Sequence, residues 1–288
     1  MQYAILGGTG TLGKALITEL LRRGNYEQNI TVISRDELKQ SIMRRTWPNI
    51  KYVLGDVRDR RRMIEVIDHD VVFYAAALKQ VDTIESNVGE AIKTNVIGSM
   101  NVAEACRTNF VHHCVFCSTD KAVLPINAYG YTKGLSEKYF LSLNGEKGTH
   151  FTVCRWGNVA ASRGSAIPYF VKLLKDNKTI PITDERMFRF FMKIEDAASF
   201  MLDTFPSKYK TTQIPKMKAA PVIAVVDALA RILKVEWCFE ITGIRPGEKL
   251  DECLWTSHEK CIKSSDKDIQ FTRDELIDFL KPIVESIA

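Results

Sequence analysis

The chain has 288 residues, of which 45% are hydrophobic and 26% charged, and this composition is typical of a globular protein. The net charge of +5 gives no reason to expect a nucleic-acid partner, and the basic run at residues 58–63 is interpreted as the solvated first turn of a surface helix. There is no run of roughly 18 apolar residues and no signal sequence, so we expect a cytoplasmic protein with no membrane partner.

Short apolar runs alternate with helical patterns through the first 160 residues. Strands are predicted at residues 3–6, 30–34, 51–55, 71–76, 113–118 and 151–155. Helices are predicted to begin near Thr11, Asp36, Arg58, Asn87, Asn127 and Ser165. Because continuous apolar strands that alternate with helices form parallel sheets covered on both faces, the pattern predicts an α/β fold of the Rossmann type, with a doubly wound parallel sheet.

This regularity ends after residue 160. Short strands near 178–184, 188–193 and 236–242 are interleaved with helices near 195–204 and 221–233. We therefore expect a dinucleotide-binding domain at residues 1–160, whose sheet is completed by parts of the later chain. Residues 161–288 are expected to form mainly a smaller substrate-binding α/β lobe and C-terminal helices.

The first predicted strand leads directly into the sequence GGTGTLGKAL, residues 7–16. Glycines 8, 10 and 13 fit the pattern GxGxxG, and glycines 7, 10 and 13 fit a related wider spacing. Glycines let the turn close tightly and let a pyrophosphate approach the backbone where a helix begins. The turn is therefore predicted to bind a dinucleotide through Gly7, Gly10, Thr11, Leu12 and Gly13.

The end of the second predicted strand bears on the choice between NAD and NADP. NAD sites carry a carboxylate there for the ribose 2′-hydroxyl, whereas NADP sites carry a cation for the 2′-phosphate. Ser34 and Arg35 end the strand and Lys39 follows shortly after, so NADP is favoured over NAD because a guanidinium suits a phosphate. Asp36 leaves NAD open, since its carboxylate would serve the 2′-hydroxyl or cap the next helix.

The third predicted strand is followed by Asp56 and Val57, and both are predicted to contact the cofactor. Asp56 is placed to receive the adenine amino group. An ordinary helix N-cap is an equally weighted interpretation of the same aspartate, because short acidic side chains accept hydrogen bonds from the first turn of a helix.

Seven cysteines with irregular spacing fit reduced thiols in a reducing compartment. The sequence HHCVFC, residues 112–117, imitates a metal-binding CxxC motif, but it is apolar and is predicted to be a strand. Because the side chains of a strand alternate between its faces, Cys114 and Cys117 point to opposite sides of the sheet. They cannot share one metal ion, and no metal site is predicted.

Two pairs of reactive side chains lie in STDKAVLPINAYGYTKG, residues 118–134. Tyr129 and Lys133 are four residues apart, so on a helix the ammonium lies beside the phenol. A neighbouring positive charge favours the phenolate, and Tyr129 is therefore predicted to remove an alcohol proton while a nicotinamide takes the hydride. Asp120 and Lys121 are adjacent just before this pair, and they add an acid and an amine that a simple dehydrogenation does not need.

Between residues 7 and 250 the chain carries, in order, the motifs GGTGTLGK, SRDELKQ, GDVRD, AAALKQV, STDKAV and GIRPGEKL. Together they resemble the extended short-chain dehydrogenase/reductase superfamily, and more narrowly the C5-inverting UDP-N-acetylglucosamine 4,6-dehydratases that open pseudaminic acid synthesis. The resemblance covers most of the chain but not the segment after residue 250. Leu124 stands where that family usually has asparagine.

The resemblance implies roles for the two pairs. Tyr129 would deprotonate the sugar C4 hydroxyl as hydride passes to NADP, and the hydride would later return to C6. Between these steps Asp120 would protonate the departing C6 hydroxyl and Lys121 would remove the C5 proton, so the enzyme would be a lyase without net redox change. A lysine base needs a lowered pKa, which we expect for Lys121 from desolvation and from the charge of Lys133.

The resemblance also implies contacts outside this stretch. Asn95 would anchor the water network of Tyr129. Further cofactor contacts are expected from Ala75, Ala76, Ala77, Lys79, Asn95, Val159 and the Tyr129–Lys133 pair. Contacts with the UDP-sugar substrate are expected from Lys79, Asn158, Arg163, Gly164, Ser165, Thr183 and Arg245.

Two alternative functions stay open. A UDP-amino-sugar epimerase would use the same cofactor and the same tyrosine, but epimerisation at C4 needs no base at C5. A non-catalytic NADP-binding protein would be expected to have lost the Tyr–Lys pair, whereas Tyr129 and Lys133 are both present. A homo-oligomer is expected, because members of this superfamily usually dimerise through helices that correspond to residues 87–109 and 127–145.

Overall fold

The computed structural model describes residues 1–144, 148–205, 211–256 and 261–287. Its largest element is a six-stranded parallel sheet in the order β3-β2-β1-β4-β5-β6. The strands are β1 (Tyr3–Leu6), β2 (Ile30–Ser34), β3 (Lys51–Leu54), β4 (Val71–Tyr74), β5 (His113–Cys117) and β6 (His150–Cys154). The order reverses between β1 and β4, which is the Rossmann arrangement, so the predicted fold class is confirmed.

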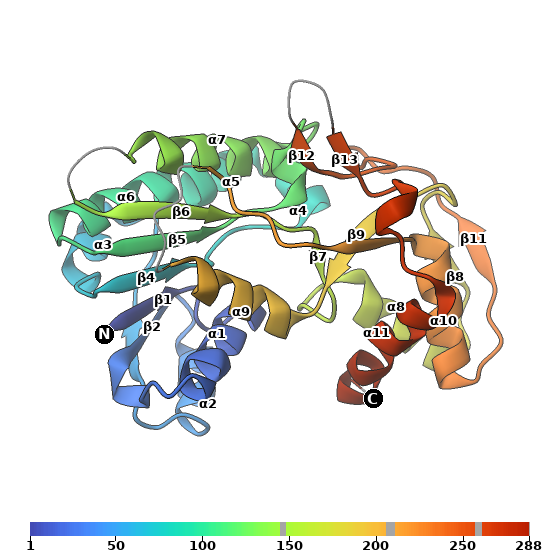
Figure 1. Cartoon of the computed structure of the whole chain (residues 1–288), viewed down its shortest axis with the longest axis horizontal. Helices are drawn as coiled ribbons and strands as arrows, with labels where there is room; N and C mark the ends of the chain where they lie inside the picture. Colours follow the sequence, from blue (N-terminus) through green and yellow to red (C-terminus); the bar gives the residue numbers. More distant parts are fainter. Residues whose placement is uncertain (145–147, 206–210, 257–260, 288) are drawn as a thin grey trace.

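Helices cover both faces of this sheet (Figure 1). One face carries α1 (Thr11–Arg22), α2 (Glu37–Arg44) and α9 (Ile194–Thr204), and the other carries α3 (Arg60–Val66), α6 (Gly98–Thr108) and α7 (Ala128–Ser142). Strands β1, β2 and β4 are buried along their whole length because helices cover them on both sides. The short connecting elements are η1 (Glu27–Asn29), α4 (Val81–Glu85), α5 (Val88–Ala91), η2 (Ile92–Ile97) and η3 (Asp120–Ala122).

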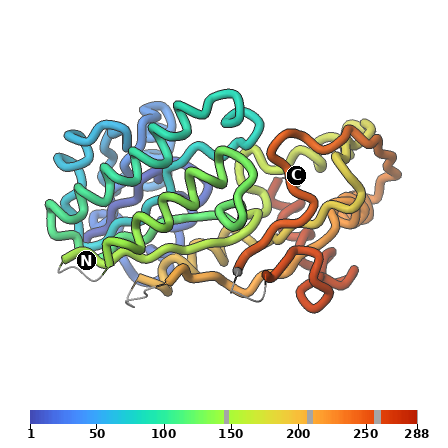
Figure 2. Tube along the Cα trace, turned by 90° about the horizontal axis from the view of Figure 1, so that it is seen from above, coloured from blue at the N-terminus to red at the C-terminus, as the bar shows by residue number. Residues whose placement is uncertain are grey.

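Most of the later chain forms a smaller lobe beside the large sheet. Figure 2 shows the blue-to-green part of the chain at one end of the molecule and most of the yellow-to-red part at the other. Helices α8 (Ala166–Lys175), α10 (Val222–Leu233) and α11 (Arg273–Ile287) share a core that includes Phe170, Leu229 and Leu280. Helix α9 is the exception among the later helices, because it packs against α1 on the large sheet and not in the lobe.

Three small sheets complete the lobe and join it to the large domain. Strand β9 (Phe188–Met192) lies between β7 (Asn158–Val159) and β10 (Lys218–Pro221). Strand β8 (Ile180–Ile182) pairs in parallel with β11 (Phe239–Ile241), and β12 (Cys253–Thr256) pairs in antiparallel fashion with β13 (Cys261–Lys263). A short turn, η4 (Lys267–Ile269), precedes the last helix.

The cysteines differ in part from the expectation. Cys114 lies in the core on one face of the sheet and Cys117 packs against the core on the other, so their predicted separation is confirmed. Cys253 and Cys261 form a disulfide that joins β12 to β13, and the expectation of reduced thiols is therefore wrong for this pair. Cross-strand pairing brings these two together, and their spacing along the chain does not reveal it. Within the described residues no group of side chains is arranged to hold a metal ion.

The surface features predicted from charge are confirmed where the structure describes them. The basic run enters α3 at Arg60, where Arg60 pairs with Glu104 and Arg61 pairs with Glu65 at 3.1 Å on the exposed face. Within the described ranges, no helix has both the length and the apolar character that crossing a membrane would require.

Candidate active site

The glycine-rich turn lies against the end of β4. Gly7 has a φ of +78°, and a Cβ at this position would come within 2.8 Å of the Ala76 nitrogen. A Cβ on Gly13 would stand only 2.4 Å from the Gly8 Cα. Both positions therefore require glycine, and the turn can deliver a phosphate to the first residues of α1 without interference from side chains.

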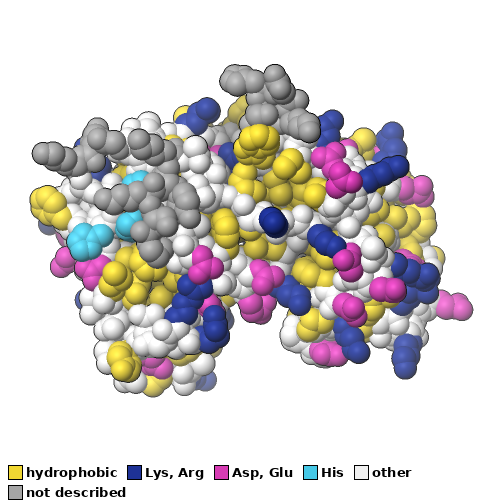
Figure 3. Space-filling view, in the orientation of Figure 1, with side chains coloured by type: hydrophobic (Ala, Val, Ile, Leu, Met, Phe, Trp, Pro, Cys, Tyr) yellow, Lys and Arg dark blue, Asp and Glu magenta, His cyan; other side chains and the backbone are white. Residues whose placement is uncertain are grey.

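A cavity of about 590 Å³ opens above the carboxyl ends of β1, β2 and β4. Ten of the predicted cofactor residues line it: Gly7, Gly10, Ser34, Arg35, Asp36, Lys39, Val57, Ala75, Ala76 and Ala77. A second cavity of about 590 Å³ continues along α1 to the lobe, past Thr11 and Arg163. The surface is hollowed in the same region, between α2 and α11 (Figure 3). The size, the glycine turn and the cations at one end fit a dinucleotide.

Other residues predicted to contact the cofactor do not line these cavities, among them Leu12, Gly13 and Val159. Leu12 and Gly13 do not line the cavity, since Leu12 packs against the core and Gly13 against Gly8. Val159 belongs to β7, where it pairs with Met192 of β9.

Asn95 does not face the cavity. Its side-chain oxygen accepts a hydrogen bond from the Leu78 nitrogen at 2.9 Å, and its amide donates to the Leu78 oxygen at 3.0 Å and to the Thr132 hydroxyl at 3.1 Å. Asn95 therefore ties the loop after β4 to α7, and its role in the water network of Tyr129 stays a prediction.

The end of β2 presents both cations that were expected there. Arg35 is half exposed and lies 3.6 Å from Asp56. Asp36 caps α2 by accepting a hydrogen bond from the Lys39 nitrogen at 2.9 Å, and its other oxygen pairs with the Lys39 ammonium. The capping interpretation of Asp36 is confirmed, and this carboxylate is already engaged by Lys39.

Two further side chains near this end are engaged by protein groups. The Ser34 hydroxyl accepts a hydrogen bond from Gln40 at 2.9 Å. Asp56 is bound by the Arg58 guanidinium at 2.6 Å, and Asp59, not Asp56, caps α3. The interpretation of Asp56 as a helix N-cap is therefore wrong: the helix begins three residues later than that cap would require.

Tyr129 and Lys133 lie on the first turns of α7, which Asn127 caps by accepting a 2.7 Å hydrogen bond from the Gly130 nitrogen. Lys133 is buried, donates to the Cys117 carbonyl at 2.6 Å, and holds its ammonium 3.8 Å from the centre of the Phe116 ring. Burial lowers the pKa of Lys133 to about 8.

Burial raises the pKa of Tyr129 above its ordinary value, with a further contribution from Cys117, and the Thr119 hydroxyl opposes this only in part. The expected lowering of the Tyr129 pKa by Lys133 is therefore wrong for the structure as it stands. Desolvation of the phenolate outweighs it, and the Lys133 ammonium is directed to the Cys117 carbonyl.

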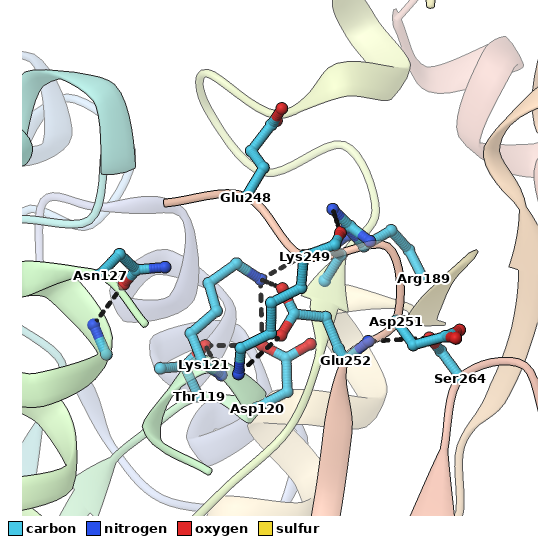
Figure 4. Close-up of polar contacts among 12 residues, drawn as sticks. Thr119, Asp120, Lys121, Asn127, Arg189, Glu248, Lys249, Asp251, Glu252 and Ser264 are labelled. Atoms are coloured by element: carbon cyan, nitrogen blue, oxygen red, sulfur yellow. Dashed lines mark hydrogen bonds and ion pairs between the residues drawn. The ribbon is translucent and has the colours of Figure 1, made fainter. Parts of the chain in front are cut away.

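Asp120, Lys121 and Glu252 form a buried group that we call the ionic cluster (Figure 4). The Lys121 Nζ lies 3.1 Å from the Asp120 Oδ1 and 3.3 Å from the Glu252 Oε1. Asp120 is fully buried at η3, after the end of β5, and its Oδ1 also accepts from the Thr119 hydroxyl at 2.9 Å. Its Oδ2 is buried and has no hydrogen-bond partner among the described residues.

The pKa of Lys121 differs from the expectation. Burial opposes its charged form, but the negative charges of Asp120 and Glu252 outweigh burial and raise the pKa above its ordinary value. The expected lowering is therefore wrong. The reason is first the adjacent Asp120 and then Glu252, which comes from a part of the chain more than 100 residues away and which the sequence motifs did not identify.

The segment that carries Glu252 is held from both halves of the molecule. The Arg189 guanidinium donates to the carbonyl oxygens of Lys249 and Leu250 at 2.9 and 3.1 Å. Arg155 binds Glu137 of α7 at 2.9 Å and donates to the Leu254 oxygen at 2.9 Å. Helix α7 and the start of β12 therefore share one guanidinium.

The residues predicted to contact the substrate surround the ionic cluster at different distances. The Asn158 side-chain oxygen lies 3.5 Å from the Lys121 Nζ, which places it beside the cluster. The Lys79 Nζ donates to the Ser162 hydroxyl at 3.3 Å, and the Arg163 nitrogen donates to the Thr11 hydroxyl at 3.2 Å. These contacts draw the loop after β7 over the glycine turn.

The remaining predicted substrate residues lie along the lobe. Gly164 has a φ of +72° and its oxygen accepts from Gln80 at 3.5 Å, while the Ser165 hydroxyl is buried without a hydrogen-bond partner among the described residues. Arg245 pairs with Glu248 at 2.6 Å. The Thr183 hydroxyl donates to the Met187 sulfur at 3.4 Å, so Thr183 contacts the connection between β8 and β9 and none of the cluster residues in the described contacts.

Known proteins resemble this chain along most of its length. The UDP-N-acetylglucosamine 4,6-dehydratase (inverting) of Campylobacter jejuni is 44% identical over 264 residues, which are 88% of this chain and 77% of that protein. A UDP-glucose 4-epimerase of Rickettsia bellii is 40% identical with the same coverage. The X-ray structure of Pen from Bacillus thuringiensis matches 100% of this chain and 98% of its own, with a TM-score of 0.90 and 29% identity. Residues 4–273 match the polysaccharide biosynthesis protein family, and the chain therefore belongs to that family.

Proposed function

We propose that this protein is an NADP-dependent UDP-N-acetylglucosamine 4,6-dehydratase of the inverting type. The observation that carries the proposal is the ion pair of the buried Asp120 with the largely buried Lys121, 3.1 Å apart on η3, immediately before the helix of Tyr129 and Lys133. Loss of water across C5 and C6 needs an acid and a base in addition to a hydride-transfer pair, and these four side chains supply both. The 44% identity with the C. jejuni dehydratase supports the same reaction.

Hydride transfer at C4 begins the proposed reaction. When bound, NADP supplies a hydride acceptor that later serves as the donor, so that no net oxidation occurs. Tyr129 removes the proton of the C4 hydroxyl. Because burial raises the pKa of Tyr129, this step requires the Lys133 ammonium to turn from the Cys117 carbonyl towards the phenolate on the same helical face. The resulting C4 ketone acidifies the proton on C5.

The elimination uses the other pair. The Asp120 Oδ2 has no hydrogen-bond partner among the described residues, so it is available to donate a proton to the C6 hydroxyl. The protonated hydroxyl leaves as water. The Lys121 Nζ takes the C5 proton. The two transfers leave a carboxylate beside an ammonium and an enone, whose C6 would take back the hydride while C5 takes a proton from water. One proton transfer from the Lys121 Nζ to the Asp120 carboxylate and loss of the Tyr129 phenol proton to water then restore the acid and both bases for the next turnover.

The finer choice of NADP over NAD is supported by the groups at the end of β2. Arg35 lines the cavity with an exposed guanidinium, whereas the Asp36 carboxylate is bound to Lys39 and is less available to a ribose hydroxyl. The UDP diphosphate is assigned to Arg163, Gly164, Ser165 and Arg245, and the sugar is assigned to Asn158 and Lys79 beside the ionic cluster.

A homo-oligomer is part of the proposal. Apolar side chains are exposed on η2, α6 and α7, among them Ile97, Met100, Tyr131 and Leu135. These lie on the helices through which the superfamily was expected to dimerise, and burial of their apolar surface between two copies would stabilise such an assembly. The protein is proposed to act in the cytoplasm, where nucleotide sugars are made.

An epimerase is the second candidate, because a UDP-glucose 4-epimerase is 40% identical to this chain. The test is to incubate the protein and NADP with UDP-N-acetylglucosamine and to follow the sugar by proton NMR. A C6 methyl doublet together with a C4 ketone or its hydrate is the expected result, and the couplings of the C5 proton report the configuration. A product that differs only at the C4 hydroxyl would replace the dehydratase by the epimerase.

A further inference from the structure

Glu252 is a buried carboxylate that the proposed reaction has not yet used. Its side chain is 2% exposed, and its Oε1 lies 3.3 Å from the Lys121 Nζ. Its Oε2 has no hydrogen-bond partner among the described residues and lies 3.8 Å from the Lys249 Nζ. A carboxylate taken out of water costs free energy unless cations compensate it, so this position requires its cationic neighbours.

The backbone on either side of Glu252 holds it in register with Lys121. The Glu252 nitrogen donates to the Ser264 hydroxyl at 3.0 Å, and the Ser264 nitrogen donates to the Glu252 oxygen at 2.9 Å. Lys249, three residues earlier, donates to the Val123 carbonyl at 2.8 Å, next to the loop of Lys121. The segment is therefore fastened on both sides of the carboxylate, and its direction is fixed by more than one ion pair.

The charge balance of the elimination shows what a second carboxylate contributes. Asp120 must carry a proton when it acts as the acid, so at that moment it is neutral. A positive charge develops on Lys121 as the C5 proton arrives, and a neutral Asp120 cannot compensate it. Glu252 stays anionic through this step and lies at the same nitrogen, at 3.3 Å.

We propose that Glu252 is a positioning residue for the elimination: its carboxylate holds the Lys121 Nζ beside Asp120 and stabilises the ammonium that forms when Lys121 takes the C5 proton. This inference rests on the proposed dehydratase function. No bond changes at Glu252 itself, and the C5 proton moves from carbon to the Lys121 nitrogen while the Asp120 proton leaves with water.

The proposal predicts the pH dependence of the reaction. Asp120 and Lys121 share one proton, which Asp120 carries when Lys121 is the neutral base, so turnover falls as pH rises through the Lys121 pKa and the pair loses that proton. Removing the negative charge of Glu252 lowers that pKa, and the falling limb moves to lower pH. The other charged groups that act on Lys121 or lie near it are Asp120 on η3, Arg189 on β9, Lys79 after β4 and Lys249 before β12.

The test compares Glu252→Gln with Asp251→Asn, which removes the same charge from the adjacent residue. The Asp251 carboxylate points to the Ser264 hydroxyl at 3.3 Å and away from Lys121, so it is a matched control (Figure 4). The NADP-loaded proteins, labelled with 13C at lysine Cε, are titrated by NMR, and the Lys121 signal is assigned by its loss in Lys121→Arg. The pH profile of turnover is measured in parallel.

Glu252→Gln is expected to lower the titration midpoint of Lys121, and the falling limb of turnover, by about one pH unit, whereas Asp251→Asn leaves both in place. Equal midpoints in the two variants would overturn the inference. If Glu252→Gln does not fold, Lys249→Met decides: loss of that cation should move the midpoint upward, and an unmoved midpoint rejects the role. A wild-type protein that makes no C6 methyl product would instead overturn the proposed function, which the titration does not depend on.

Discussion

The cofactor cavity and the ionic cluster are assembled in different ways. The cavity is lined mainly by the ends of β1 and β2 and by turns that follow β1, β2, β3 and β4, so most contributions come from the carboxyl ends of strands of one parallel sheet. The ionic cluster joins η3, after β5, to a segment more than 100 residues later, and that segment is held by Arg189 and Arg155. Cofactor binding therefore depends on one rigid sheet, whereas the elimination depends on how the lobe docks against it. Substitutions in the cavity are therefore expected to affect cofactor binding, and substitutions in the ionic cluster are expected to affect the elimination.

The largest difference between the effect on elimination and the effect on cofactor binding is expected from Lys121→Ala. Loss of the base should lower turnover by about 10²- to 10⁴-fold, while NADP binding is retained. The measurement is the exchange of the C5 proton with deuterated solvent, together with the NADP content of the purified protein. Lys138→Ala, which removes an exposed lysine from α7, should exchange like the wild type. Unaltered exchange in Lys121→Ala would reject this lysine as the base.

Gly13→Ala tests the glycine turn of the cofactor cavity. Its Cβ would stand 2.4 Å from the Gly8 Cα, so the glycine turn must shift, and we expect a loss of about 1–3 kcal/mol in the free energy of unfolding together with weaker NADP binding. Urea denaturation and cofactor titration measure the two effects. Gly89→Ala meets no atom within 4 Å and is the matched control, with no loss expected. A Gly13→Ala protein as stable as the wild type would contradict the described packing of the turn.

Arg35→Gln should weaken NADP binding by about 1.5–3 kcal/mol, or roughly 10- to 150-fold, and leave NAD binding nearly unchanged, because only NADP offers a 2′-phosphate to the guanidinium. Dissociation constants for both cofactors give the answer. Arg58→Gln is a suitable comparison, since Arg58 also pairs with Asp56 but does not line the cavity. Equal losses for NAD and NADP would assign Arg35 to the support of Asp56.

The smallest effect is expected at Leu124, between η3 and α7. This leucine is exposed and has a φ of +44°, in the left-handed region that asparagine tolerates better. Leu124→Asn should therefore raise the free energy of unfolding by about 0.5–1 kcal/mol without altering NADP binding. Urea midpoints at matched pH provide the measurement, and a lower midpoint would show that the exposed leucine makes contacts that outweigh the backbone strain.

The difference in how the cavity and the ionic cluster are assembled also explains which features could be predicted from the sequence. Strand and helix patterns predicted the six-stranded sheet and the glycine turn, because these depend on neighbours within a few residues along the chain. The capping of α2 by Asp36 was foreseen as one of two interpretations for the same reason. Asp56 was misjudged as a cap because Asp59, three residues later, competes for the same helix end.

The ionic cluster lay beyond such patterns. Lys121 was expected to have a lowered pKa from burial and from Lys133, but Asp120 and Glu252 together raise it. Nothing in the spacing between residues 121 and 252 predicts that Lys121 and Glu252 are in contact. The disulfide between Cys253 and Cys261 escaped for the same reason, as it depends on strand pairing. Only the segment GIRPGEKL, which ends two residues before Glu252, pointed to this part of the chain.

Helix α9 bears on how such enzymes diverge. It follows the first lobe elements in the chain, yet it packs against α1 beneath the cofactor turn. A recombination event that replaced everything after residue 160 with a relative's sequence would replace two features together. These are α9, which packs beneath the glycine turn, and Glu252, which pairs with Lys121. Variation inherited in blocks is therefore expected to survive mainly within α8, α10 and α11, which pack mainly against one another, so that such a block can change without rebuilding the half that holds the nucleotide.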